Sequence, residues 1–278
     1  MTYPTLMVHL ELGGSNAARL RIAGDLAERF QAGVIGIAAC QPIRNTYSNW
    51  GDCYISGEIV QEDREEIEKE MKAGEAEFRA ALQSRVGTIE WRSRVMFGSL
   101  SDYVASQARS ADLIVTGVAP KAMFDESRRV NTADLVMQAG RPVLIAPAAA
   151  NTLKLDRVIV GWKDTREARR AALDALPLLK KAGHVTVVEI AAEEDLAEVG
   201  KHLDDVVSWL KRNGVAAVSI AAPSTGADAT GLREFARQQE ADLIVAGAYG
   251  HSRVREWALG GVTRDLLLCA DRCSLVSH

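Results

Sequence analysis

The feature of this sequence that most constrains its fold is an internal repeat. Ala111-Asp-Leu-Ile-Val115 returns 130 residues later as Ala241-Asp-Leu-Ile-Val245, and a glycine follows each copy, Gly117 or Gly247. The other matched segments are Leu6-Met-Val8 with Val158-Ile-Val160, Ser15-Asn-Ala-Ala18 with Thr165-Arg-Glu-Ala168, Asn131-Thr-Ala-Asp-Leu135 with Val262-Thr-Arg-Asp-Leu266, and Gly140-Arg-Pro-Val-Leu-Ile145 with Arg272-Cys-Ser-Leu-Val276. Self-similarity at a nearly constant offset indicates two homologous units in tandem.

The boundary between the units is predicted in Pro147-Ala-Ala-Ala-Asn151, a stretch of small residues after an apolar run. The two predicted domains are then residues 1-148 and 153-278. The chain has 278 residues, of which 47% are hydrophobic, and this is enough apolar mass for two small cores.

Short apolar runs alternate with helical patterns through the second unit. The predicted strands cover 157–160, 185–190, 215–220, 243–246 and 274–277, and the predicted helices cover 166–179, 196–211, 230–239 and 263–270. Asp164 and Thr165 can each cap the first helix, and Pro177 is a place where a fresh turn can start. Strands separated by helices of this length need right-handed crossovers and a parallel sheet covered on both faces. The predicted fold class is α/β, with two tandem five-stranded parallel-sheet sandwiches of the Rossmann-like, nucleotide-binding type packed as an intramolecular pseudo-dimer.

Glycines frame the loop that follows the predicted strand ending at Ala246. The chain reads Gly247-Ala-Tyr-Gly250, then nine residues, then Gly260-Gly261-Val262-Thr263. A phosphate group needs backbone N–H donors at close range, and glycine lets the main chain approach that closely. A helix beginning near Gly261 would add its unpaired amides and the positive end of its dipole. On glycine content alone, an ordinary turn before a closely packed helix explains the pattern equally well.

The glycine loop leaves the edge of the sheet at which parallel α/β proteins bind ligands. Ligands of such sheets lie beyond the carboxyl ends of the strands, where the strand order changes direction. The glycine loop follows the fourth predicted strand of the second unit, and the turn at 161–165 follows the first. We therefore expect the two loops to line one crevice.

The second unit resembles the universal stress protein family. It combines Asp242-Leu-Ile-Val245, Gly-x-x-Gly, nine residues, Gly-Gly-Val-Thr and a terminal Leu275-Val-Ser-His278. The resemblance covers both units and is far stronger in the second, so the chain looks like a tandem-domain member. In that family, Gly-x-x-Gly-x(9)-Gly-[Ser/Thr] marks the members that bind ATP, because its backbone and hydroxyl groups hold the ribose and the phosphates.

Carried across residue by residue, the family motif falls on Gly247, Gly250 and Gly260. Gly261 stands where Ser or Thr is usual, which removes one hydroxyl, whereas Thr263 matches the second hydroxyl position. The resemblance thus implies that nucleotide binding is weakened rather than abolished.

The turn after the first predicted strand of the second unit departs from the family pattern. It reads Trp162-Lys163-Asp164, with Lys163 where the family has an aspartate that reaches the nucleoside. Asp164, the next residue, is a candidate adenosine contact, and a plain helix cap is the alternative. Lys163 is a candidate phosphate partner, and a solvated lysine is the alternative.

Three more residues complete the implied site. Ile190 stands where the adenine of family members rests on an aliphatic side chain, although it can equally be plain core. His251 and Arg253 follow the first glycine pair and are candidates to lie over the phosphates, with exposed loop charge as the alternative.

The first unit lacks the glycine pattern. Pro120, which has no N–H to donate, stands against Gly250, and the β-branched Val130 stands against Gly261. We therefore expect no nucleotide binding of the same kind there. Leu12-Gly-Gly-Ser15 is either a small anion nest or a flexible turn. A long segment at 41–62 leads into an acidic helix whose apolar stripe is Ile67, Met71, Phe78 and Leu82.

Several other classes of function lack support in the sequence. The net charge of −4, without a basic patch interleaved with aromatics, speaks against nucleic acid or an anionic membrane as partner. No long uncharged apolar stretch and no signal-peptide pattern is found, so we expect a cytoplasmic location. The four cysteines and five histidines form no ligand set for a metal. Dinucleotide, P-loop and nucleophile-elbow motifs are absent, and no dedicated catalytic base is found.

The resulting hypothesis is a stress-associated regulatory protein that holds ATP in its second unit, with AMP or ADP as alternatives and Mg as a companion ion. It would act on a protein partner that the sequence does not identify. Two alternatives stay open: a non-catalytic scaffold whose crevices are empty or hold another small ligand, and an enzyme limited to slow ATP hydrolysis. Family members commonly dimerise through the last strand of each unit, so we expect Val143-Leu-Ile145 to pair with Leu275-Val276 within the chain. Association of two chains stays open.

Overall fold

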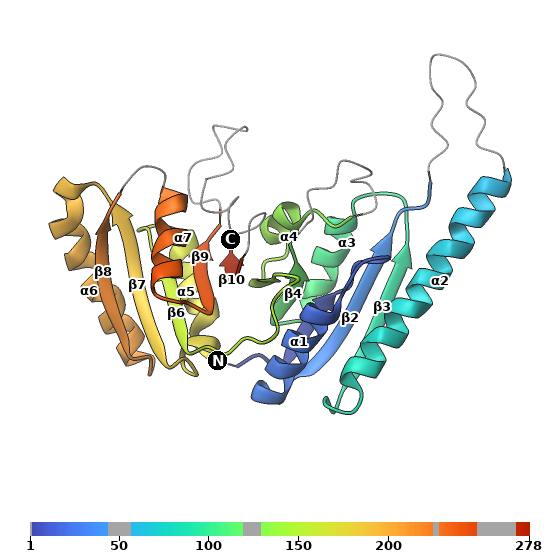
Figure 1. Ribbon diagram of the computed structural model, residues 1–278, viewed down its shortest axis with the longest axis horizontal. Helices are drawn as coiled ribbons and strands as arrows, with labels where there is room; N and C mark the ends of the chain where they lie inside the picture. Colours follow the sequence, from blue (N-terminus) through green and yellow to red (C-terminus); the bar gives the residue numbers. More distant parts are fainter. Residues whose placement is uncertain (1, 44–56, 119–128, 225–227, 249–270) are drawn as a thin grey trace, which may run out of the picture.

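Ten strands form a single sheet that runs across the whole molecule (Figure 1). The computed structural model describes residues 2–43, 57–118, 129–224, 228–248 and 271–278. The strands are β1 (Thr5–His9), β2 (Gly33–Cys40), β3 (Ile89–Val95), β4 (Leu113–Gly117), β5 (Val143–Ala146), β6 (Arg157–Gly161), β7 (His184–Ala191), β8 (Ala217–Pro223), β9 (Leu243–Gly247) and β10 (Cys273–Ser277). Their order in the sheet is β3-β2-β1-β4-β5-β10-β9-β6-β7-β8. Each half of this order is the same five-stranded arrangement, as the repeat predicted.

Helices link the parallel strands of both units. They are α1 (Ala17–Phe30), α2 (Gly57–Leu82), α3 (Leu100–Gln107), α4 (Thr132–Gln138), α5 (Arg166–Leu179), α6 (Leu196–Arg212) and α7 (Asp228–Gln238), with short 3-10 turns η1 (Ala108–Ser110) and η3 (Glu193–Asp195). The strands and helices predicted for the second unit are confirmed within a few residues at their ends. One detail differs, because α5 continues through Pro177 without a new start. The helix predicted over 263–270 lies outside the described residues.

The inner strands of the sheet are buried on both faces because they carry apolar side chains on both sides, whereas the edge strands β3 and β8 are partly exposed. Leu6 and Val8 of β1 belong to one buried cluster, and Met7 between them belongs to another. The first cluster collects residues from α1, α2, α5 and α6, and the second collects residues from α3, α4 and α7. The stripe predicted on α2 is confirmed, since Ile67, Met71, Phe78 and Leu82 are all buried.

The repeated aspartates have a structural role that the sequence did not reveal. The Asp112 carboxylate accepts a hydrogen bond from the backbone N–H of Thr5 at 2.9 Å, and Asp242 does the same for Arg157 at 2.9 Å. The backbone N–H of each aspartate in turn donates to the carbonyl of the same partner at 2.8 Å. Each aspartate thus fixes the start of one strand against the start of its neighbour.

The two units join through β5 and β10, the only antiparallel pair among the described strands. Ser274, Leu275 and Val276 are register partners of Ile145, Leu144 and Val143, which confirms the predicted pairing. Each unit therefore covers an edge strand of the other. Beside this seam, the Tyr3 hydroxyl of the first unit donates to the Asp174 carbonyl of α5. The domain limits at residues 148 and 153 themselves stay a prediction.

Candidate functional site

The sheet of the second unit changes direction between β6 and β9. The chain continues from β6 to β7 on one side, whereas β9 lies on the other side of β6. Gly161 at the end of β6 is the register partner of Ala246 near the end of β9. The loops after these two strands therefore leave the same edge at neighbouring positions, as predicted. This is the place where open α/β sheets bind ligands.

Gly247 ends β9 directly against the first turn of α5. A Cβ at this position would lie 2.5 Å from the backbone nitrogen of Ala168 and 2.5 Å from the carbonyl carbon of Glu167. Real Cβ atoms do not approach a backbone that closely, so any larger residue would push α5 away from the strand. Gly247 therefore has a packing reason to be glycine, whether or not a ligand binds. Ala246, the residue before it, is buried.

The loop after β6 begins with Trp162, whose backbone N–H continues the strand pairing by donating to Val188 at 2.8 Å. Trp162 is 7% exposed, and its indole Nε1 is enclosed without a hydrogen-bond partner in the part of the chain that the structure describes. Lys163 follows and is half-buried. An unpaired buried donor is costly, so the indole N–H is a polar group for which the described residues supply no acceptor.

Asp164 points to solvent and pairs with Arg169 at 2.6 Å, its side chain 63% exposed. The cap of α5 is the other candidate, Thr165, whose hydroxyl accepts a hydrogen bond from the Ala168 N–H at 3.3 Å. The capping alternative for Asp164 is thus not observed, and its carboxylate stays accessible at the mouth of the loop.

A carboxylate already faces the positive end of α5. Glu167 is buried in the first turn of the helix and accepts a hydrogen bond from Arg166. Burial alone would raise the pKa of Glu167, but hydrogen bonds from Arg166, from its own backbone amide and from Thr165 hold the pKa below its usual value. Because this charge satisfies the α5 dipole, phosphate binding at the crevice would depend on groups of the loops.

Ile190 lies near the end of β7 and belongs to the buried core. It is 6% exposed, and its Cγ2 would lie 3.3 Å from a Cβ at Gly231 of α7. Its side chain therefore packs under α7, which is the core alternative considered from the sequence. The remaining predicted site residues lie outside the described residues and stay predictions: Gly250, His251, Arg253, Gly260, Gly261, Val262 and Thr263.

The corresponding crevice of the first unit is filled by its own side chains. A cavity of about 30 Å³ remains among the described residues there, lined by residues that include His9, Glu11, Arg19 and Arg129. Glu11 pairs with Arg19 at 3.0 Å and with Arg129 at 3.4 Å. Arg19 packs so closely on Gly117, the counterpart of Gly247, that a Cβ there would lie 2.5 Å from its Nε. Sequence reasoning missed this cluster, although Glu11 and Arg19 stand in the segment matched to Lys163 and Arg169.

Burial also affects three potentially reactive groups of the described chain. Desolvation, reinforced by the Arg19 charge, lowers the pKa of His9 to about 3. The thiols of Cys40 and Cys273 are both buried. Within the described ranges, no group of three or more His, Cys, Asp or Glu residues is placed to hold a metal ion. None of the described helices has the length and apolar character that a membrane crossing requires.

Comparison with known proteins finds solved structures of the same architecture. No family model and no curated protein matches the chain. Among solved structures, a universal stress protein from Archaeoglobus fulgidus DSM 4304 matches with a TM-score of 0.73 at 15% identity, covering 98% of this chain and 95% of its own. A functionally unknown protein from Pseudomonas aeruginosa PAO1 gives 0.63 at 13% identity over 99% and 92% of the two chains. A protein from P. aeruginosa UCBPP-PA14, provisionally named a universal stress protein, gives 0.62 at 13% over 99% and 93%. These likenesses show a shared fold along the whole chain.

Proposed function

We propose that this chain, a tandem of two universal stress protein folds, is a nucleotide-binding regulatory protein that holds ATP in its second unit. The observation that carries the proposal is the parallel pairing of β6 with β9, which brings the glycine loop and the Trp162 loop to one edge of the sheet. In the sequence, the glycine loop has the spacing that marks ATP-binding members of that family. Neither fact alone would suffice, because folds host many functions.

The described residues supply part of the site in this proposal. Lys163 contributes a positive charge for the phosphates, because Glu167 already occupies the positive end of α5. His251 and Arg253, which lie outside the described residues, are proposed to do the same. The Asp164 carboxylate accepts a hydrogen bond from a ribose hydroxyl and gives up its ion pair with Arg169. That pair is exposed to solvent, so losing it costs little. ATP would enter with Mg, because the phosphates themselves supply oxygen ligands that Mg²⁺ prefers.

We further propose that the first unit does not bind nucleotide. Its crevice retains about 30 Å³ among the described residues, whereas pockets for small ligands are roughly 300–1,000 Å³. Opening it would require removing the Arg19 guanidinium from its buried pairing with Glu11, and breaking such a pair is costly.

The proposal is tested by mass spectrometry of nucleotide released from purified full-length protein, followed by calorimetric titration with ATP, ADP and AMP, each with and without Mg. Gly250→Pro and Gly261→Val place the residues of the first unit into the second loop, and both should abolish binding. Gly261→Ser restores a hydroxyl and should tighten binding by about fivefold, the effect of one hydrogen bond. Gly200→Ala, on α6 with open space at the Cβ position, is the matched control.

Failure of the wild-type protein to bind any adenine nucleotide at millimolar concentration would sink the proposal and leave the scaffold alternative. Wild-type affinity in Gly250→Pro would instead place the site elsewhere. Phosphate release, measured separately, decides whether the bound ATP is held or slowly hydrolysed.

A further inference from the structure

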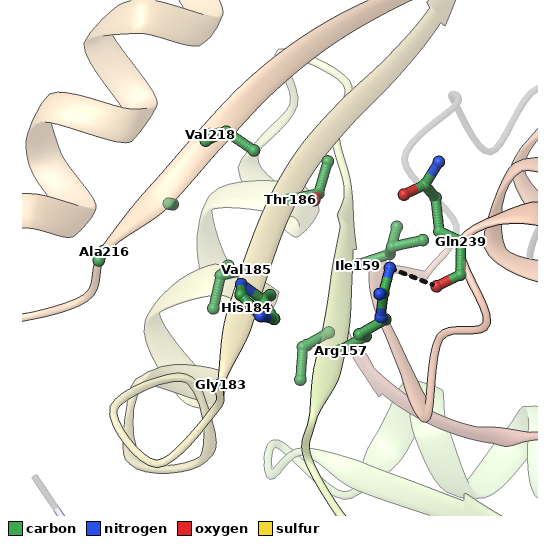
Figure 2. Close-up of a pocket in the computed structure, with 11 residues that line it drawn as sticks. Arg157, Ile159, Gly183, His184, Val185, Thr186, Ala216, Val218 and Gln239 are labelled. Carbon is green, nitrogen blue, oxygen red and sulfur yellow. Dashed lines mark hydrogen bonds between the residues drawn. The ribbon is translucent and has the colours of Figure 1, made fainter.

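A second cavity, of about 350 Å³, opens at the opposite edge of the second unit's sheet. It lies at the amino ends of β6, β7 and β8, with Arg157 and Gln239 on one side and Val218 on the other (Figure 2). Its size falls in the range of small-molecule sites. Because the glycine loop leaves the carboxyl ends of the strands, this cavity is independent of the proposed nucleotide site.

The register of the strands builds the floor of the cavity. Arg157 of β6 is the register partner of His184 of β7, and two residues further on Ile159, Thr186 and Val218 are partners across three strands. Register partners in a sheet point to the same face, and residues two apart share that face. Two adjacent rows of side chains thus form one surface, polar in the first row and largely apolar in the second.

Helix α7 leaves the part of these two rows toward β8 uncovered. Its Leu232 packs over the next row of the sheet, where a Cβ at Gly161 would lie 2.7 Å from it. The helix then ends at Gln238, and Gln239 forms a wall of the cavity. Val218 consequently remains 58% exposed, although Ile159 beside α7 is fully buried.

In the first unit, an arginine side chain covers the corresponding surface of the sheet. The strand register aligns Glu90 and Arg92 of β3 with Val218 and Ile220 of β8. Arg92 pairs with Glu90 at 2.7 Å, and it also donates to Gln107 at 3.2 Å and Ser110 at 2.9 Å, which ties the edge strand to the helix above the sheet. The fold is therefore compatible with a covered sheet surface at this position. We call the Glu90–Arg92 pair the strap, and in the second unit the apolar residues Val218 and Ile220 stand in its place.

The polar groups around the cavity favour an anion. Arg157 carries a permanent charge, and its side chain makes one long contact, 3.5 Å from Nη1 to the Gln239 carbonyl. The neighbouring carboxylate of Asp242 binds the Arg157 backbone N–H and does not line the cavity. His184 and the Thr186 hydroxyl add further donors on the same face. An arginine fork matches a carboxylate in geometry as well as in charge.

We propose that this cavity binds a small amphipathic carboxylate. The carboxylate lies against Arg157 and His184, and the apolar body of the ligand covers Val218 and the exposed part of Thr186. The binding is non-covalent and needs no metal, cofactor or nucleotide.

The test titrates the full-length protein with benzoate and with benzyl alcohol, which has a similar ring and no charge, and follows binding by ligand-observed NMR. Benzoate should bind with a Kd of about 1 mM or lower and at least tenfold more tightly than benzyl alcohol. Arg157→Gln should weaken benzoate binding about tenfold or more. Val218→Glu combined with Ile220→Arg transplants the strap of the first unit and should abolish binding. Lys201→Gln, which removes an exposed positive charge on α6, is the control and should bind like wild type.

Circular dichroism checks that each variant is folded, and Thr186→Ile replaces any variant that is not. This substitution introduces the residue that the first unit has at the same register position, Ile35, and it should weaken binding of the carboxylate. The proposal is overturned by absence of benzoate binding up to about 10 mM. It is equally overturned by equal binding of benzyl alcohol, or by wild-type affinity in either the Arg157 or the strap variant.

Discussion

Leu144 and Leu275 lie directly opposite each other across the antiparallel pair of β5 and β10, and neither side chain is exposed to solvent. They come from different units and belong to one buried cluster that also includes Leu6 of β1 and Leu203 of α6. The two copies of the repeat are therefore joined by a shared core and a shared sheet, so that the units are expected to unfold together.

Coupling across this seam is measurable in a double-mutant cycle. Leu144→Ala and Leu275→Ala should each lower the free energy of unfolding by about 2–5 kcal/mol, because each leaves a cavity in a closely packed core. The pair should be non-additive by about 0.5–3 kcal/mol, as expected for side chains in contact. Urea unfolding gives these values. Leu144→Ala combined with Leu203→Ala on the distant α6 is the control pair, and coupling of similar size there would argue against a direct contact.

Gly247→Ala should destabilise the protein even without nucleotide. The new methyl group meets the backbone of α5 at 2.5 Å, and overpacking of this kind costs about 1–3 kcal/mol. Gly200→Ala should have the opposite sign and stabilise by about 0.5–1 kcal/mol, because Gly200 lies inside α6 with nothing within 4 Å of its Cβ position. An unchanged urea midpoint in Gly247→Ala would contradict the packing role.

His9 should stay neutral in the folded protein well below the pH at which histidine ordinarily takes up a proton. Burial, and then the Arg19 charge, lower its pKa to about 3, whereas in the unfolded chain it lies near 6.5. The unfolded state therefore binds more protons between these values, and the stability due to neutral His9 is lost as the pH falls from about 6.5 towards 3, by an amount on the order of 4 kcal/mol.

NMR titration of the His9 ring checks this expectation directly. Its carbon shift should remain constant down to about pH 5. His9→Gln should reduce the loss of stability on acidification relative to wild type. A ring that titrates near pH 6.5 in the folded protein would show that the first crevice is open to water.

Cys273 should resist alkylation in the native state. Burial, and then the nearby Asp242 charge, raise the pKa of its thiol to about 12, so very little thiolate exists at pH 8. Iodoacetamide labelling followed by peptide mapping should find Cys273 modified only after unfolding in urea. Rapid labelling of the Cys273 peptide in native buffer would contradict the buried position of β10.

Asp242→Asn separates the two causes of that thiol pKa. The amide removes the charge but keeps an oxygen that can accept the hydrogen bond from Arg157, so the fold should survive. Because burial is the larger cause, native Cys273 should remain unlabelled in this variant. Labelling that becomes fast without a change in the urea midpoint would show that the Asp242 charge, rather than burial, protects the thiol.

The repeat and the alternation of apolar runs with helical patterns determined the fold class from sequence. Both signals are local, since a strand such as Leu243–Gly247 is apolar on both faces wherever it stands in a parallel sheet. The repeat then allowed one copy to be read against the other, which led to the expected pairing of the last strands. The edge at which the glycine loop and the Trp162 loop meet also followed from strand order.

Other features depended on contacts between residues far apart in the chain. No sequence pattern indicates that Gly247 packs on Ala168, that Glu11 fills the first crevice with Arg19, or that Asp242 fixes the start of β6. These are matters of a few ångströms between side chains brought together by folding, and residue spacing along the chain carries no such distances. Tertiary structure also decided that α7 ends before it covers Val218, which leaves open in the second unit a surface that an arginine closes in the first.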